Sequence, residues 1–128
     1  MNNRWLSISA FFGFLGVAMG AFGAHGLKNT LTPDLLVIFE TGSRYCLIHA
    51  VVLLAVSILH QIQPSSLTNK AGWFFSIGIL IFSGTLWTLA ITNTRWLGAI
   101  TPVGGLCLLV GWSLLLWAGI KRKEPTSQ

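Results

Sequence analysis

The chain has 128 residues, of which 53% are hydrophobic and only 9% are charged. A water-soluble domain carries about 25% charged residues, so most of this surface must face lipid or another protein. The formal net charge is +5, but nucleic-acid binding is not indicated, because the basic residues stand singly at the ends of apolar runs, except for Lys121, Arg122 and Lys123.

Four apolar runs are each long enough to cross a bilayer as a helix, which needs about 20 mostly apolar residues. We expect the spans near residues 5–25, 44–62, 71–93 and 96–120. In lipid, runs of this length satisfy their backbone hydrogen bonds as helices, and the strict alternation of a membrane barrel is absent. The predicted fold class is an all-α integral membrane four-helix bundle, built as a single domain over residues 1–128.

The first run also has features of a secretory signal, since Arg4 precedes an apolar stretch that ends in small residues. Its uncharged part, residues 5–24, is long for the core of a signal sequence, and three further apolar runs follow it. We therefore expect this run to be retained as the first span.

The polar connector at residues 26–43 is expected to hold a short amphipathic interfacial helix between spans one and two. Thr32 is a suitable N-cap, Pro33 suits the first helical position, and Asp34 favours the positive end of the helix dipole. Apolar residues follow at helical spacing. Gly42 and Ser43 are expected to bend the chain where this helix meets the second span.

A candidate polar cluster lies around this connector and consists of His25, Glu40, Arg44, Tyr45 and His49. Glu40 and Arg44 have the spacing of a helical ion pair, and ionisable groups inside membrane spans are often functional. Three interpretations remain open: a structural network, a ligand or lipid-headgroup site, and a metal or catalytic site. Two histidines and one glutamate without ligand spacing predict no metal. Without a P-loop, nucleophile elbow or carboxylate pair, we expect no cofactor and no catalytic residue.

Small residues recur at helical spacing and predict close packing between helices, which in lipid depends on van der Waals contact. The glycines expected to mediate it are Gly16, Gly20, Gly84, Gly104 and Gly111.

Trp87 and Trp112 lie deep in the third and fourth runs and are expected to be packing residues. Pro102 falls in the first third of the last run, where a kink is expected.

Basic residues in the connectors predict the orientation, because cytoplasmic loops carry an excess of Lys and Arg. One side holds Arg4, Lys70, Lys121, Arg122 and Lys123, and the other holds Lys28, Arg44 and Arg95. We therefore expect a multi-pass protein of the bacterial inner membrane with both termini in the cytoplasm.

Several motifs resemble the domain of unknown function 423 family. They are residues 20–27 (GAFGAHGL), residues 39–41 (FET) with Arg44, Tyr45 and His49, residues 82–84 (FSG) and residues 101–105 (TPVGG). The resemblance covers nearly the whole chain, although Ile48 stands where the family usually has an aromatic residue before the histidine. It implies a small four-span protein of the bacterial inner membrane and no established activity.

Three functions are compatible with these patterns. The first is a non-enzymatic protein that works by association, as an accessory subunit or a small homo-oligomer, and the small-residue faces favour it. The second is transport of a small solute or proton, suggested by Pro102 and by His49 inside the membrane. The third is an enzyme acting on lipid or quinone headgroups with His25, Glu40 and His49. The partners expected are the lipid bilayer and another membrane protein or a second copy.

Overall fold

The computed structural model describes residues 3–122 and contains four α-helices joined by short connectors. They are α1 (Arg4–His25), α2 (Pro33–Ile62), α3 (Ser66–Thr92) and α4 (Thr101–Lys121), and a 3₁₀ helix, η1 (Arg95–Ala99), precedes α4. All four helices are long and apolar enough to cross a membrane, with η1 and α4 taken together as the fourth span.

The predicted all-α class with four spans is therefore confirmed, and no strand occurs between residues 3 and 122. Residues 1–2 and 123–128 lie outside the described part of the chain. Lys123, which entered the prediction of orientation, is one of them.

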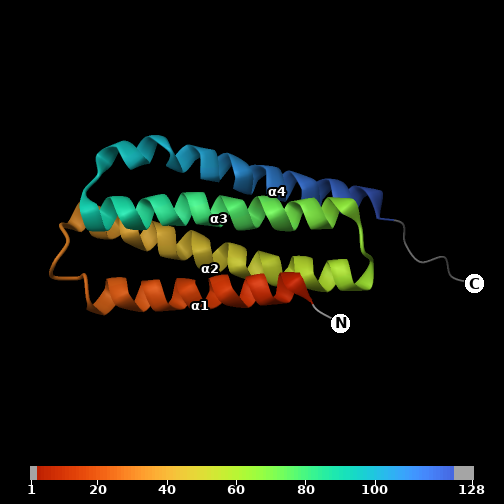
Figure 1. The fold of residues 1–128 in the computed structure, drawn as a ribbon, viewed down its shortest axis with the longest axis horizontal. Coiled ribbons are helices and arrows are strands. Elements are labelled where there is room, and N and C mark those ends of the chain that lie inside the picture. Colours follow the sequence, from red (N-terminus) through yellow and green to blue (C-terminus); the bar gives the residue numbers. More distant parts are fainter. Residues whose placement is uncertain (1–2, 123–128) are drawn as a thin grey trace, which may run out of the picture.

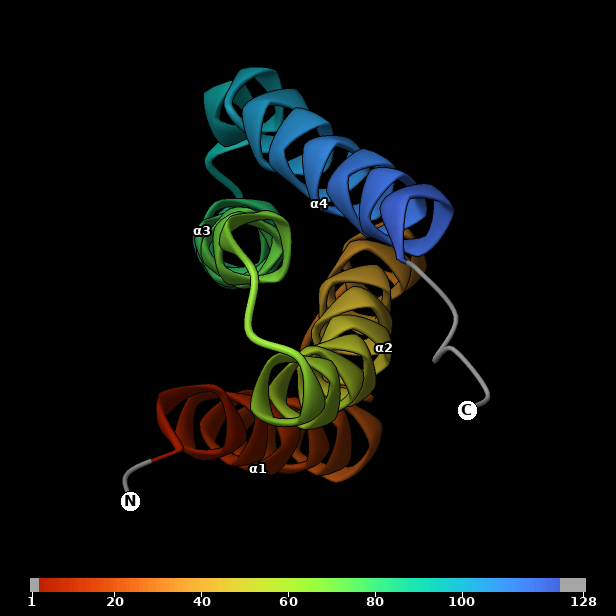
Figure 2. The ribbon, with the colours of Figure 1, turned by 90° about the vertical axis from the view of Figure 1, so that its right-hand side faces the viewer.

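The helices pack in chain order, α1 against α2, α2 against α3, and α3 against α4. They alternate in direction, so the start of α1 and the end of α4 lie at the same end of the bundle (Figure 1). The end-on view places α1 and α4 at opposite edges, with α2 and α3 between them (Figure 2). The outer helices consequently expose most of their apolar side chains, and only 17% of the fourth span is buried inside the molecule.

The interface of α1 with α2 combines a small residue with two polar contacts to the backbone. Gly16 faces Leu47 so closely that an added Cβ would lie 2.8 Å from the Leu47 Cγ. Two turns earlier, the Ser9 hydroxyl donates to the Ala50 carbonyl at 2.8 Å. These contacts hold the two backbones close together, as expected for helices in lipid.

The separate interfacial helix is not observed, because α2 continues unbroken from Pro33 through the predicted bend. Gly42 and Ser43 are buried where α2 crosses α3, and their small size makes room for Trp87. The Trp87 Nε1–H donates to the Ser43 hydroxyl at 3.0 Å, and the Ser83 hydroxyl donates to the Gly42 carbonyl at 2.6 Å. The small residues thus serve a helix crossing, and no bend is required.

Helix α2 is longer than a membrane span requires. Its 30 residues correspond to about 45 Å of helix, whereas the hydrocarbon core of a bilayer is about 30 Å thick. Part of this single helix therefore extends beyond the hydrocarbon core.

The predicted kink at Pro102 is also absent from the interior of the last helix, because α4 begins only at Thr101. Pro102 therefore stands in the first turn, where a missing N–H removes no helical hydrogen bond. The chain changes direction before the proline, through η1, and Gly104 then lies against the backbone of α3.

The five glycines expected to mediate packing fall into two groups. Gly16, Gly104 and Gly111 lie directly against a neighbouring helix, where an added Cβ would be within 2.5–2.8 Å of the nearest atom. A Cβ added at Gly20 or Gly84 would meet nothing within 4 Å, so close packing within the chain does not require a glycine at these two positions.

Candidate functional site

The structure separates the predicted polar cluster into two parts. His25, Glu40 and Arg44 are exposed, and within residues 3–122 their side chains form no ion pair. Tyr45 and His49 lie one turn apart on α2 with nearly parallel rings, whose centroids are 5.9 Å apart. Only this second pair forms part of a connected site.

His49 is the centre of that site and is 4% exposed. Its Nδ1 lies 2.8 Å from the Tyr45 carbonyl oxygen, and its Nε2 lies 3.1 Å from Nε1 of Trp112 on α4. A carbonyl only accepts and an indole N–H only donates. Nδ1 therefore carries the proton and Nε2 accepts, which assigns the neutral imidazole in its Nδ1–H form.

Aromatic rings enclose this histidine on the sides facing α3 and α4. The Phe75 ring lies 5.7 Å from His49 and 5.5 Å from Trp112, both measured between centroids. Phe75 itself lies against Gly111, where an added Cβ would be 2.8 Å from the ring. The glycine on α4 thus lets the aromatic residues of three helices meet around one imidazole.

This geometry limits what His49 can do chemically. Both ring nitrogens already have partners, and a second proton on Nε2 would point at the Trp112 N–H, so the imidazolium would lose that bond. Protonation would therefore cost one hydrogen bond, whereas the neutral imidazole keeps both of its partners. The arrangement fits a residue that ties α2 to α4.

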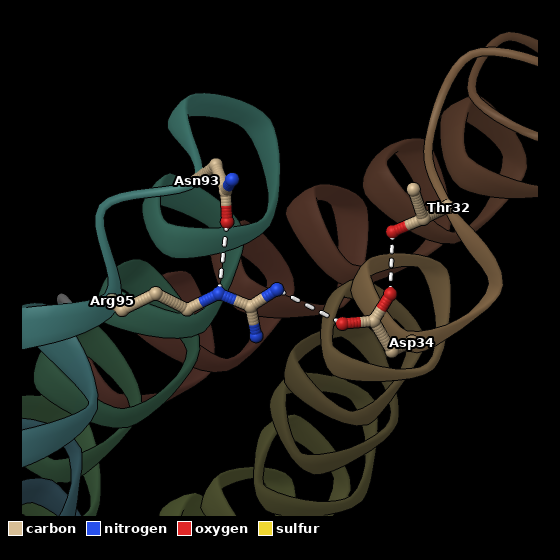
Figure 3. A network of polar contacts seen from close by, with 4 residues as sticks. All are labelled: Thr32, Asp34, Asn93 and Arg95. Atoms are coloured by element: carbon tan, nitrogen blue, oxygen red, sulfur yellow. Dashed lines mark hydrogen bonds and ion pairs between the residues drawn. The ribbon is translucent and has the colours of Figure 1, made fainter.

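A second polar group lies outside the bundle core, at the end opposite the chain termini (Figure 3). Arg95 Nη2 donates to Asp34 Oδ2 at 2.9 Å, Arg95 Nε donates to Asn93 Oδ1 at 2.8 Å, and the Thr32 hydroxyl donates to Asp34. Both partners of the ion pair are more than half exposed. These four residues join the connector before α2 to the connector after α3, independently of Tyr45 and His49.

The end of the bundle that holds the chain termini carries two cavities. One, of about 540 Å³, lies between the start of α1 and the end of α2 and includes Arg4, Trp5, Ser57 and His60 in its lining. The other, of about 430 Å³, lies among the end of α2, the start of α3 and the end of α4. His60 also contacts α3, since its Nδ1 lies 2.9 Å from the Thr68 hydroxyl.

Sequence reasoning missed two participants in these sites. Trp112 was expected only to pack, although it supplies the donor to His49 from 63 residues away along the chain. Trp5 begins the first span, where an indole ring usually lies in the headgroup region, but the structure encloses it fully inside the bundle. The signal available for the larger cavity was that Arg4 and Trp5 begin the first span and His60 lies near the end of the second, at the same side of the membrane.

A protein-family model described as protein of unknown function (DUF423) matches residues 19–105 of the chain. A UPF0382 membrane protein of Staphylococcus saprophyticus is 40% identical, over 88% of this chain and 92% of that protein. The UPF0382 membrane protein YwdK of Bacillus subtilis is 36% identical over 91% of this chain and 96% of its own length.

The UPF0382 inner membrane protein YgdD of Escherichia coli is also 36% identical, and the match covers 97% of this chain and 95% of that protein. No solved structure matches the chain. The family model covers well over half of the chain, and these relatives align with it over nearly their whole length. This four-helix chain is therefore a member of the DUF423 family, whose relatives in these bacteria carry the name of membrane proteins.

Proposed function

We propose that this protein is a non-enzymatic protein of the bacterial inner membrane that works by association, as a small homo-oligomer or as an accessory subunit. The observation that carries the proposal is Gly20, together with Gly84. Both are glycines in long membrane helices, and neither has a contact within the chain that requires the absence of a side chain.

Two glycines of α1, Gly16 and Gly20, differ in their surroundings. Gly16 and Gly20 lie one turn apart on the same face, but Gly16 packs against Leu47 whereas Gly20 faces open space. A glycine in a helix interior is less favourable than alanine by about 1 kcal/mol. In membranes, such glycines are common where a second helix approaches closely. An approaching helix from another copy or another protein would use the surface at Gly20.

The proton-transport alternative has less support from the same molecule. His49 is buried within the second span, and hydrogen bonds to both of its nitrogens favour a positioning role. Association requires no exchange of protons at this residue. Association needs only a rigid bundle whose outer helices, α1 and α4, are free to contact another protein.

Replacing Gly20 with leucine should reduce or abolish the assembled form while leaving the fold of the single chain intact. The matched control is Ala18→Leu, because Ala18 is exposed and lies on nearly the opposite side of α1. The measurement is the mass of the complex extracted from native membranes in a mild detergent, combined with helix content by circular dichroism. A wild-type protein that is extracted as a pure monomer would contradict the proposal, and so would equal masses for the two variants.

We also propose that both chain termini lie in the cytoplasm. Gln63 lies in the connector at the end with the chain termini, and Asn29 lies in a connector at the other end. In a background with Cys46→Ala and Cys107→Ala, Asn29→Cys should react with a membrane-impermeant thiol reagent added to intact spheroplasts. Gln63→Cys should react only after the membrane is permeabilised. The reverse pattern would show that the orientation is wrong.

A further inference from the structure

We propose that the cavity between the start of α1 and the end of α2 binds the phosphate-bearing headgroup of an anionic phospholipid. The cavity has a volume of about 540 Å³, which lies within the range of about 300–1,000 Å³ typical of small-molecule sites. It lies at a bundle end, because its lining comes from the first residues of α1 and the last turns of α2. That position corresponds to the headgroup level of a bilayer.

The cavity contains a hydrogen-bond donor without a partner. Trp5 lines the cavity and is 2% exposed, and its indole N–H is the only buried side-chain polar group without a hydrogen-bond partner in residues 3–122. A buried donor that finds no acceptor carries the full penalty of its desolvation. An acceptor that reached this N–H from the cavity would remove that penalty.

A cation, Arg4, lies next to this donor. The Arg4 guanidinium lies 5.4 Å from the Trp5 ring centroid and 5.5 Å from that of Trp73, so two indole rings hold it at the cavity. His60 lines the same cavity and turns Nδ1 toward Thr68, which leaves Nε2 for an occupant. Guanidinium, indole and imidazole groups can all donate to a phosphate oxygen.

The charged residues at this end of the bundle also favour an anion. Within the described part of the chain, Arg4, Lys70, Lys121 and Arg122 lie at this end and no carboxylate accompanies them, since Asp34 and Glu40 lie near the opposite end. The chain's third acidic residue, Glu124, lies outside the described residues. An anionic occupant therefore meets attraction from every described charge at this end.

The surroundings favour a lipid as the source of that anion. Leu54 and Ile58 lie on α2 inward of the cavity residues His60 and Gln61, and their side chains are 40% and 52% exposed. Apolar side chains exposed on a membrane helix contact acyl chains. A phospholipid can place its phosphate in the cavity and its chains along this surface, whereas a free anion uses only the first part.

The test measures binding of short-chain phosphatidylglycerol to the full chain in detergent by native mass spectrometry, with phosphatidylcholine of the same chain length and inorganic phosphate as separate arms. We expect phosphatidylglycerol to bind at least about tenfold more tightly than either alternative. Equal binding of the two lipids would overturn the preference for an anionic headgroup. Inorganic phosphate binding as tightly as phosphatidylglycerol would overturn the lipid as the source.

Two pairs of variants locate the site. Arg4→Gln should weaken phosphatidylglycerol binding by about tenfold, whereas Lys70→Gln, which removes an exposed cation at the same end but outside the cavity, should change it by less than about twofold. Trp5→Phe should weaken binding and Trp73→Phe should have a smaller effect. Equal losses for Arg4→Gln and Lys70→Gln would indicate general surface attraction and overturn the site. Arg4 is exposed, so its variant keeps the test valid even where Trp5→Phe disturbs packing.

Discussion

Replacing Gly104 with alanine should strongly destabilise the bundle, whereas the same replacement at the adjacent Gly105 should be tolerated. A Cβ at Gly104 would lie 2.5 Å from the backbone nitrogen of Phe82, 2.9 Å from its Cα and 3.0 Å from the Gly78 carbonyl oxygen. These are backbone atoms, so no side-chain rotation relieves the collision and α3 and α4 must move apart. At Gly105 the nearest atom would be a Phe82 ring carbon at 3.8 Å, an ordinary contact.

The difference in free energy of unfolding between the two variants is set by the cost of overpacking and by the gain in helix propensity. Overpacking a close interface costs about 1–3 kcal/mol, and we expect Gly104→Ala at the upper end because the backbone must shift. Alanine is a better helix former than glycine by about 1 kcal/mol, so Gly105→Ala should be neutral or slightly stabilising. Unfolding of the two purified variants by denaturant in mixed micelles measures the difference. Equal free energies of unfolding would contradict the close backbone contact.

The α3–α4 interface depends on this approach because lipid removes the hydrophobic drive that joins helices in water. Gly78 and Gly104 face each other, and a Cβ at Gly78 would lie 3.1 Å from the Gly104 carbonyl oxygen. One helical turn away, the hydroxyls of Thr85 and Thr101 are 2.7 Å apart. The outer helix α4 packs mainly against α3, and it is held there by the close approach of the two backbones and by the contact between the two hydroxyls.

Much of the fold was predictable because membrane helices follow simple rules. Length and hydropathy give the four spans, and Thr32, Pro33 and Asp34 correctly mark the start of a helix. What local reasoning could not predict is which role a small residue has. Gly42 was interpreted as a bend, yet it provides space for Trp87, a residue distant in sequence. Pro102 was interpreted as a kink because the start of α4 depends on the preceding turn of η1.

The candidate site was less predictable, since its contacts join residues far apart in the chain. Tyr45 and His49 were visible as neighbours on one helix, but the donor at Trp112 depends on how α4 is placed. The pairing of Glu40 with Arg44 was inferred from spacing alone, whereas the observed ion pair joins Asp34 to Arg95 across two connectors. Spacing within a helix identifies possible pairs, and tertiary packing selects among them.

Replacing His49 with alanine should destabilise the bundle by about 2–4 kcal/mol, as expected for removing a large buried side chain and leaving a cavity. The change removes the acceptor for Trp112 and the ring that packs against Tyr45 and Phe75. Ile48→Ala is the matched control, because Ile48 precedes His49 on α2 and its side chain is 46% exposed. We expect a much smaller loss there. Denaturant unfolding in mixed micelles measures both.

A second replacement, Trp112→Phe, separates the hydrogen bond from the packing. It removes the indole donor but keeps an aromatic ring, and hydrogen bonds between membrane helices average about 0.6 kcal/mol with a maximum of about 1.7 kcal/mol. When Trp112→Phe is introduced into the His49→Ala variant, it should cause little further loss of stability, because the hydrogen bond is already absent. If the two losses simply add, the two residues act independently. If His49→Ala is as stable as the wild type, His49 does not hold α2 to α4, and a role in moving protons regains support.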